Sequence, residues 1–353
     1  MGRSRTSASV LAFSLLLLAP WLLGPSVFGP SALGADPAAR PDIEALRLNQ
    51  LQFIGTHNSY HVRSPTARTV KEWAYSHPPL DVQLDRGVRS FELDLHFRND
   101  EFQVFHVPVL DEGSTCRRLA DGLATVRKWS EAHPGHMPIS FLLELKKDGA
   151  GLDRRVTYVD GPLLDRLDTL LREGFAPGQI LTPDDVRGSA ETLRGAIETT
   201  GWPTLAKTRG KVMFILHDQE KQRDLYAEGH PSLRGRAMFV RSDDKRDDGA
   251  VMILDSPNSP NVPRFAAAGY FIRTRADADL REDVEGKSRR RDKAFASGAN
   301  ILSTDFPTGE SQGPVQGSPQ DNSSYVVEFP GAAPARVNPV SGPPELRGQT
   351  VAE

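Results

Sequence analysis

Eight short runs of apolar and β-branched residues recur along the chain, and they constrain its fold more than any other feature. The segments between most of them place apolar residues at helical spacing, as at 119–129 and 163–171. Strands that alternate with helices favour a parallel sheet, and eight such strands suit a closed (β/α)8 barrel. The runs are Leu51–Gly55, Val88–Leu95, Phe102–Phe105, Ile139–Leu145, Lys211–Leu216, Val251–Asp255, Tyr270–Arg273 and Ile301–Thr304.

One link departs from this alternation. The segment between the runs at 88–95 and 102–105 is too short to hold a helix, and Ala237–Val240 is a further strand candidate. We therefore predict an α/β, TIM-barrel-like fold that is irregular at this link.

The chain length of 353 residues accommodates one such barrel, and 38% hydrophobic with 25% charged residues is typical of a globular protein. We assign residues 36–330 to the barrel domain. Residues 307–353 hold eight prolines and six glycines, a composition typical of irregular segments. We therefore expect 331–353 to be an irregular tail, with Tyr325–Phe329 as one more strand candidate.

The first residues have the organisation of a secretory signal peptide. Arg3 and Arg5 precede an apolar run from Val10 to Leu23, and small residues follow at 31–35. This run is shorter than the roughly 18 to 20 residues of a spanning helix, which disfavours the alternative of a retained membrane anchor. We expect residues 1–35 to be removed and the protein to be secreted.

Charge and cysteine content exclude several classes of function. Removing this leader changes the formal net charge from 43 − 46 = −3 to 41 − 46 = −5, which leaves no basic footprint for nucleic acid. Cys116 is the only cysteine, so an internal disulfide is impossible. The chain has no Gly-rich phosphate loop, CxxC pair, HExxH helix or GxSxG elbow. Carboxylate and histidine chemistry remain.

Polar side chains cluster at or just after four of the predicted strands. In a parallel barrel these strand ends face one rim, where active sites of such barrels lie. Within one strand, Glu92, Asp94 and His96 are two residues apart and so point to the same side. Two buried carboxylates this close need a cation or a proton between them. The clusters are Thr56–Ser59, Glu92–His96, Phe105–Pro108 and Glu144–Asp148.

The oxygen side chains of these clusters suit a hard divalent ion, calcium or magnesium, better than zinc. Two histidines, His57 and His106, end neighbouring strands and are able to donate hydrogen bonds or protons to a phosphate held on that ion. A single histidine at a strand end is more often structural, but the combination predicts a catalytic site. The predicted metal ligands are Asn58, Glu92, Asp94 and Glu144.

Four ordered motifs resemble those of the catalytic domain of the phosphatidylinositol-specific phospholipase C family. The resemblance covers roughly residues 48–330 and is to the metal-dependent branch, in particular to the secreted bacterial calcium-dependent enzymes. It implies a phospholipase-C-like phosphodiesterase barrel and Ca²⁺ as cofactor. The motifs are Gly55–Tyr60 (GTHNSY), Arg89–Asp94 (RSFELD), Phe105–His106 and Pro138–Glu144 (PISFLLE).

The resemblance also implies roles for single residues. His57 would stabilise the phosphorane-like transition state, and His106 would be the general acid. The chemistry itself also needs a base for the attacking hydroxyl, and a calcium carboxylate, Glu92 or Glu144, is able to fill that role. The implied reaction is cleavage of the glycerol-side phosphodiester bond of phosphatidylinositol by an inositol hydroxyl, giving diacylglycerol and inositol phosphate. The implied calcium ligands are Asn58, Glu92, Asp94 and Glu144.

Lys146 and Arg273 are candidates for binding the phosphate or the inositol hydroxyls of a substrate. Arg275 shares the strand face of Arg273, and Asp305 ends the last strand, where it orients a hydroxyl or caps the turn. The expected partner is a phospholipid head group at a membrane surface. We expect no nucleic acid, no obligate protein partner and a monomer.

Two other functions fit parts of this pattern. A glycerophosphodiester phosphodiesterase shares the paired carboxylates and calcium, but its first motif normally reads His-Arg-Gly where this chain has His57-Asn58-Ser59. A non-catalytic barrel that binds surfaces is the alternative from another class. The complete set of histidines and oxygen ligands disfavours it.

Overall fold

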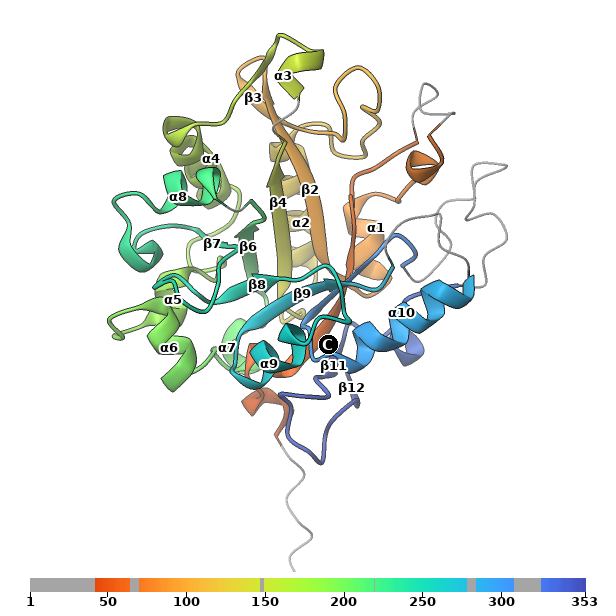
Figure 1. The fold of residues 1–353 in the computed structure, drawn as a ribbon, viewed down its shortest axis with the longest axis vertical. Helices are drawn as coiled ribbons and strands as arrows, with labels where there is room; N and C mark the ends of the chain where they lie inside the picture. Colours follow the sequence, from red (N-terminus) through yellow and green to blue (C-terminus); the bar gives the residue numbers. More distant parts are fainter. Residues whose placement is uncertain (1–41, 64–69, 147–148, 219, 278–283, 308–324) are drawn as a thin grey trace, which may run out of the picture. The chain divides into compact units, whose positions relative to one another are not determined.

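The computed structural model of the chain describes residues 42–63, 70–146, 149–218, 220–277, 284–307 and 325–353. Eight parallel strands follow one another in the order β7-β6-β4-β2-β1-β10-β9-β8 (Figure 1). The barrel strands are β1 (Leu51–Thr56), β2 (Val88–Arg98), β4 (Ile139–Leu145), β6 (Val212–Leu216), β7 (Met238–Val240), β8 (Val251–Ile253), β9 (Phe271–Arg275) and β10 (Ile301–Thr304).

The two end strands of this order meet through a single bridge between Arg241 and Val251. There the Ser242 amide donates a hydrogen bond of 3.0 Å to the Val251 carbonyl. The sheet is thus a nearly closed parallel barrel, which confirms the predicted α/β barrel class.

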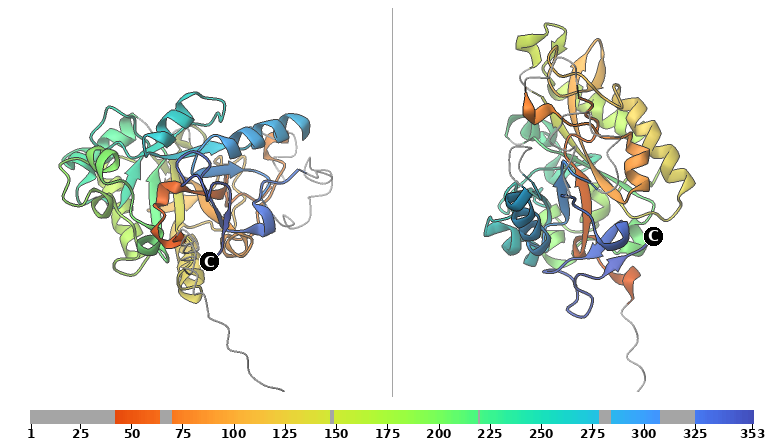
Figure 2. Two further views of the ribbon diagram at one scale, coloured as in Figure 1. Left: turned by 90° about the horizontal axis from the view of Figure 1, so that it is seen from below. Right: turned by 90° about the vertical axis from the view of Figure 1, so that its right-hand side faces the viewer.

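Helices cover the outside of the strands. Helix α4 shows how the sequence specifies one: Asp160 caps its first turn by accepting from the Leu163 amide, and Leu164, Leu167 and Leu171 bury one face. In the right-hand view of Figure 2, α1 and α2 lie on one side of the strands and α9 and α10 on the other. The helices are α1 (Leu80–Asp85), α2 (Leu119–Ala132), α3 (Gly149–Leu152), α4 (Gly161–Glu173), α5 (Pro183–Arg187), α6 (Leu193–Thr199), α7 (Leu205–Thr208), α8 (Lys221–Ala227), α9 (Asn261–Ala267) and α10 (Val284–Ala296).

One strand assignment from the sequence was wrong. The run at Phe102–Phe105 forms β3 (Glu101–Val104), which pairs antiparallel with the end of β2 and is not a barrel strand. The two residues between them, Asn99 and Asp100, have φ values of 55° and 64°, as a tight hairpin turn requires. The eighth barrel position belongs to β7, which lies within the further candidate Ala237–Val240.

The hairpin extends β2 beyond the barrel. A short strand, β5 (Val156–Thr157), also pairs with the end of β2, and Figure 1 shows β3 and α3 beyond that end.

The segment 331–353 is more ordered than its proline and glycine content indicates. It forms β11 (Ala335–Val337) and β12 (Thr350–Val351), and β11 pairs antiparallel with the start of β1. Glu353 Oε1 accepts from Arg89 Nη2 at 2.6 Å and from the Met137 amide at 2.8 Å. The candidate Tyr325–Phe329 makes one parallel bridge, between Val327 and Pro307, and is not a strand.

The predicted signal peptide lies outside the described residues. Among the residues that are described, no helix has both the length and the apolar character needed to cross a membrane.

Alternation along β2 divides its side chains between two environments. Phe91 packs on Phe141 of β4, with ring centroids 5.6 Å apart, and Phe141 stacks on Phe214 of β6 at 5.1 Å. The next residue, Glu92, contacts Arg273 of β9, which is three positions away in the strand order. Such a pair forms only across the barrel interior, so the interior is polar at this level.

Candidate active site at the carboxyl ends of the barrel strands

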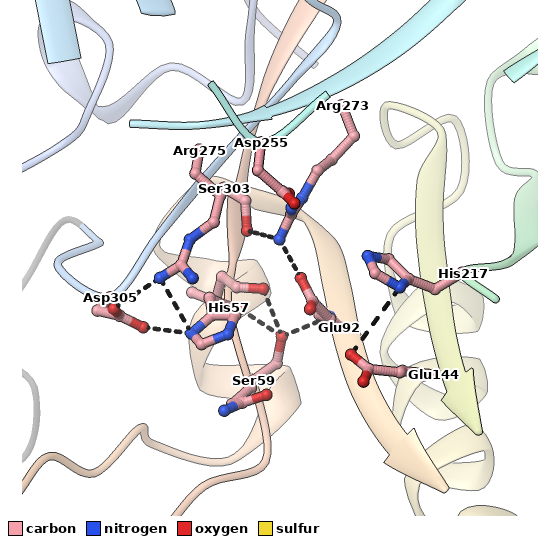
Figure 3. Close-up of polar contacts among 12 residues, drawn as sticks. His57, Ser59, Glu92, Glu144, His217, Asp255, Arg273, Arg275, Ser303 and Asp305 are labelled. Atoms are coloured by element: carbon pink, nitrogen blue, oxygen red, sulfur yellow. Dashed lines mark hydrogen bonds and ion pairs between the residues drawn. The ribbon is translucent and has the colours of Figure 1, made fainter. Parts of the chain in front are cut away.

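Three side chains from adjacent strands converge at this level of the barrel. Ligand-type atoms of Glu92, Glu144 and His217 lie within 4.8 Å of one another, from β2, β4 and the residue after β6 (Figure 3). Asp94 is opposite Glu144 in the β2–β4 register. Glu92 is 3% and Asp94 0% exposed, so the structure brings three predicted metal ligands into one buried acidic cluster.

Two basic side chains partly neutralise this cluster. Arg273 forms ion pairs with Glu92 and with Asp255, and its guanidinium also donates to Ser303 Oγ at 3.3 Å. Lys146 Nζ lies 3.0 Å from Asp94 Oδ2 and 3.0 Å from Glu144 Oε1. The structure therefore pairs both predicted substrate-binding cations with predicted metal ligands.

These contacts shift the acidities in opposite directions. Burial alone would raise the pKa of Glu92, but Arg273 and then His57 outweigh it and lower this pKa to about 2. Burial raises the pKa of Asp94 in spite of Lys146. Burial would lower the pKa of Lys146, yet the carboxylates of Asp94 and Glu144 raise it above its ordinary value. The ammonium of Lys146 therefore stays charged.

The residues present fit a calcium ion. Both carboxylate oxygens of Asp94 are buried and make no hydrogen bond among the described residues, although Lys146 is close enough for an ion pair. Asn58 Nδ2 donates to the Tyr75 hydroxyl at 3.0 Å. This bond uses the NH₂ group of the amide, whereas the amide oxygen is the atom that would bind a cation. Carboxylate and amide oxygens are the ligands that calcium takes in proteins.

His57 forms a compact group with Asp305 and Arg275 (Figure 3). Its Nδ1 lies 2.7 Å from Asp305 Oδ1, and Arg275 Nη2 lies 3.1 Å from Asp305 Oδ2. Burial would raise the pKa of Asp305, but His57 and Arg275 hold it well below its usual range. The carboxylate thus accepts the Nδ1–H proton, and Nε2 is the ring nitrogen left for chemistry.

His106 has a carboxylate partner of its own. Its Nδ1 lies 3.0 Å from Asp111 Oδ2, and its side chain is 19% exposed. The Trp73 ring packs edge-on against the imidazole, with centroids 5.2 Å apart. Both predicted catalytic histidines are therefore held through Nδ1 by buried carboxylates.

Sequence reasoning missed His217 and Asp111. His217 directly follows strand β6, as Thr56-His57 ends β1, so the rule that found the other strand-end residues applies to it as well. No sequence signal indicates Asp111, because it reaches His106 through the turn of a loop. Asp305 and Arg275, by contrast, lie where the sequence placed them and contact His57.

The sequence profile of the family described as phosphoinositide phospholipase C, Ca²⁺-dependent, matches residues 46–101 and 96–339. No curated protein sequence matches the chain.

Solved structures of two bacterial enzymes resemble the chain. Calcium-dependent phosphoinositol-specific phospholipase C from the Gram-negative bacterium Pseudomonas sp. is 19% identical, with a TM-score of 0.54 over 84% of this chain and 96% of that one. The Ca²⁺-dependent phosphatidylinositol-specific phospholipase C from Streptomyces antibioticus is 20% identical, with a TM-score of 0.51 over 74% and 95%. These structures share the fold, and the profile match shows the family. The chain therefore belongs to the calcium-dependent phosphoinositide phospholipase C family.

Proposed function

We propose that this protein cleaves the glycerol-side phosphodiester bond of phosphatidylinositol by attack of an inositol hydroxyl, giving diacylglycerol and inositol phosphate. The observation that carries the proposal is the pair of histidine–carboxylate couples, His57–Asp305 and His106–Asp111, beside one acidic cluster. Against the effect of burial, His57 helps Arg273 to lower the pKa of Glu92, and His106 opposes the rise in the pKa of Asp94, so both couples lie close to this cluster.

Asn58, Glu92, Asp94 and Glu144 would hold the calcium ion. When bound, the ion supplies positive charge that stabilises the phosphate oxygens as negative charge develops on them. This assignment rests on the fit of the donor set and on family membership.

The residues around the cluster have separable roles. Asp305 accepts the Nδ1–H of His57 and so favours the doubly protonated ring, which is the form that donates from Nε2 to a phosphate oxygen. His106 delivers a proton from Nε2 to the leaving glycerol oxygen. Glu92 is a poor proton acceptor because its pKa is about 2. Burial would raise the pKa of Glu144, but Lys146 outweighs it and lowers this pKa as well. The Glu144 side chain is nevertheless 29% exposed, compared with 4% for Glu92, so it is the carboxylate that an inositol hydroxyl is able to reach.

A membrane surface is the proposed partner. In the described part of the chain, the exposed large apolar side chains are Val109, Leu110, Leu152 and Tyr158, at 60%, 45%, 51% and 41%. They belong to the loop after His106 and to the segment between β4 and α4, next to the extended end of β2. Lys221 Nζ lies 4.9 Å from the centre of the Tyr158 ring, and Arg155 is 63% exposed. Apolar tips with adjacent cations suit an anionic lipid surface.

Secretion through removal of residues 1–35 and a monomeric state complete the proposal. The signal-peptide organisation of residues 1–35 supports secretion, and the monomeric state is our expectation from the sequence.

Hydrolysis of a phospholipid panel tests the function. Vesicles of phosphatidylinositol or phosphatidylcholine are incubated with the protein in calcium and in excess chelator, and released phosphate esters are identified. We expect rapid release of inositol phosphate only with calcium, because choline has no hydroxyl beside the phosphate for internal attack. Full turnover in chelator would exclude the calcium role. Equal rates on both lipids, or preference for water-soluble glycerophosphodiesters, would favour a glycerophosphodiester phosphodiesterase instead.

A further inference from the structure

Behind His106 lies a second, fully buried histidine. His61 is 0% exposed, and its Nε2 lies 2.8 Å from Asp111 Oδ2, the same oxygen that His106 Nδ1 contacts at 3.0 Å. The two imidazole rings are nearly perpendicular, with centroids 6.1 Å apart. One oxygen of Asp111 thus lies between two histidines. His106 is the partly exposed one at the candidate active site, and His61 is buried behind it.

The hydrogen-bond roles of His61 follow from its neighbours. Its Nδ1 lies 2.9 Å from the Tyr75 carbonyl oxygen, which only accepts, so Nδ1 carries a proton. Its Nε2 faces a carboxylate oxygen, so a further proton lies between His61 and Asp111. This contact fixes the direction of the Asp111 carboxyl group, whose other oxygen, Oδ1, is buried without a hydrogen-bond partner among the described residues.

The backbone around this group is held on both sides. Val107 and Asp111 exchange two backbone hydrogen bonds, of 2.9 and 2.8 Å, which close the turn that carries Asp111. The Val62 amide donates to the Gly113 carbonyl at 3.2 Å, and a Cβ at Gly113 would lie 1.8 Å from the Val62 carbonyl oxygen. The loop that carries His106 is therefore packed directly against the segment that carries His61.

We propose that His61 is a positioning residue for His106: through Asp111 it fixes the His106 ring so that Nε2 meets the leaving glycerol oxygen. The Tyr75 ring lies against His61, with centroids 4.4 Å apart, and blocks movement of the imidazole away from Asp111. Without His61, the buried carboxyl group loses the donor that orients it, and His106 loses a fixed acceptor. This inference rests on the proposed function, in which His106 protonates the leaving group.

The test compares two substrates that differ in the leaving group. Phosphatidylinositol needs a proton on the departing glycerol oxygen, whereas 4-nitrophenyl myo-inositol 1-phosphate releases a stable phenolate. We expect His61→Gln to lower kcat on phosphatidylinositol by about 10- to 100-fold, the range seen when residues that orient site ligands are replaced. On the nitrophenyl substrate the loss should be under about threefold, because a general acid contributes little there.

A double variant separates positioning from general loosening of the fold. If His61 acts through His106, His61→Gln combined with His106→Ala is no slower than His106→Ala alone. The matched control is His136→Gln. His136 is equally buried, with Nε2 2.7 Å from Ser130 Oγ, but lies just before β4, at the opposite end of that strand from Glu144. This control should lower the melting temperature, and any loss of kcat that it causes should be the same on both substrates.

The possible outcomes distinguish a positioning role of His61 from a purely structural one. Equal losses on both substrates, or additive losses in the double variant, would show that His61 is merely structural. If His61→Gln does not fold, Asp111→Asn, which keeps the side-chain volume, is measured in its place and should show the same leaving-group dependence. A wild-type protein that cleaves neither substrate would overturn the proposed function itself, a result distinct from failure of the His61 proposal.

Discussion

The ammonium group of Lys146 bridges Asp94 and Glu144, at 3.0 Å from one oxygen of each. Asp94 is completely buried, whereas the Lys146 side chain is 24% exposed. One side-chain cation therefore balances two carboxylates that we assign to calcium. Calcium binding and this ion pair are consequently coupled.

Lys146→Met tests that coupling. Without calcium, the variant leaves Asp94 buried and unpaired, and we expect its free energy of unfolding to fall by about 2 to 3 kcal/mol, below the range for fully buried pairs. Saturating calcium should restore most of the loss, because the ion binds the folded state. Urea unfolding with calcium and with chelator measures both. Lys128→Met, at an exposed position of α2, is the control, and an identical loss with and without calcium would contradict the coupling.

Asp305→Asn tests the support that this carboxylate gives to His57. Asparagine keeps the shape of the side chain but lacks the charge that favours the doubly protonated ring. We expect kcat to fall by at least about 100-fold at temperatures where the variant is folded, and the melting temperature also to fall, because Arg275 loses its carboxylate partner. Steady-state kinetics on phosphatidylinositol checks this, and a near-normal kcat would return Asp305 to the role of a turn cap.

Arg273→Met examines the pair that crosses the barrel. Arg273 and Glu92 have side chains 2% and 4% exposed, so removal of the guanidinium leaves a buried carboxylate without its main partner. We expect a loss of about 3 kcal/mol in the free energy of unfolding, measured in chelator. Glu92→Gln in the same chain should recover part of this loss. A double variant that is less stable than Arg273→Met would show that the pair is not what stabilises the barrel here.

Glu112 provides a prediction about acid stability. Burial would raise its pKa, but hydrogen bonds from Arg98 and Arg117 and from the Val109 amide lower it from 4.5 to about 2. A carboxyl group whose pKa is lower in the folded state stabilises the fold above its unfolded pKa. This contribution is lost as the pH falls from about 4.5 to about 2.

The loss should be about 2 kcal/mol, after allowance for the 28% exposure of the Glu112 side chain. Unfolding by urea between pH 5 and pH 2.5 measures it, and Glu112→Gln should reduce the slope of stability against pH. An unchanged slope in this variant would assign the acid sensitivity to other carboxyl groups.

Local pattern predicted seven of the eight barrel strands and the side of β2 on which Glu92 and Asp94 lie, for a physical reason. Parallel strands present their carboxyl ends on one rim, so Glu92, Asp94 and Glu144 are brought together by topology alone. The error at Phe102–Phe105 arose because a hairpin strand and a barrel strand have the same apolar composition. Only the two-residue turn, Asn99–Asp100, distinguishes them, because it is too short for the crossover that joins parallel strands.

Contacts that depend on loops were not predictable in this way. Asp111 reaches His106 because a turn closes between 107 and 111, and His61 meets Asp111 because two loops pack together. The pairing of Lys146 with Asp94 and Glu144 was also missed. For Lys146, residue type and position after a strand are consistent both with substrate binding and with ion pairing. Only the position of its side chain in the structure distinguishes these two roles.

Strand β1 has partners that come late in the chain. Phe53 pairs with Ile301 of β10, and Leu51 pairs with Val337 of β11, whereas β2, β4 and β6 are neighbours in both sequence and space. Closing so long a loop costs conformational entropy before any contact rewards it, and folds rich in distant pairings form slowly. During synthesis, β1 is the first barrel strand to emerge, yet its pairing is incomplete until residue 337 has been added.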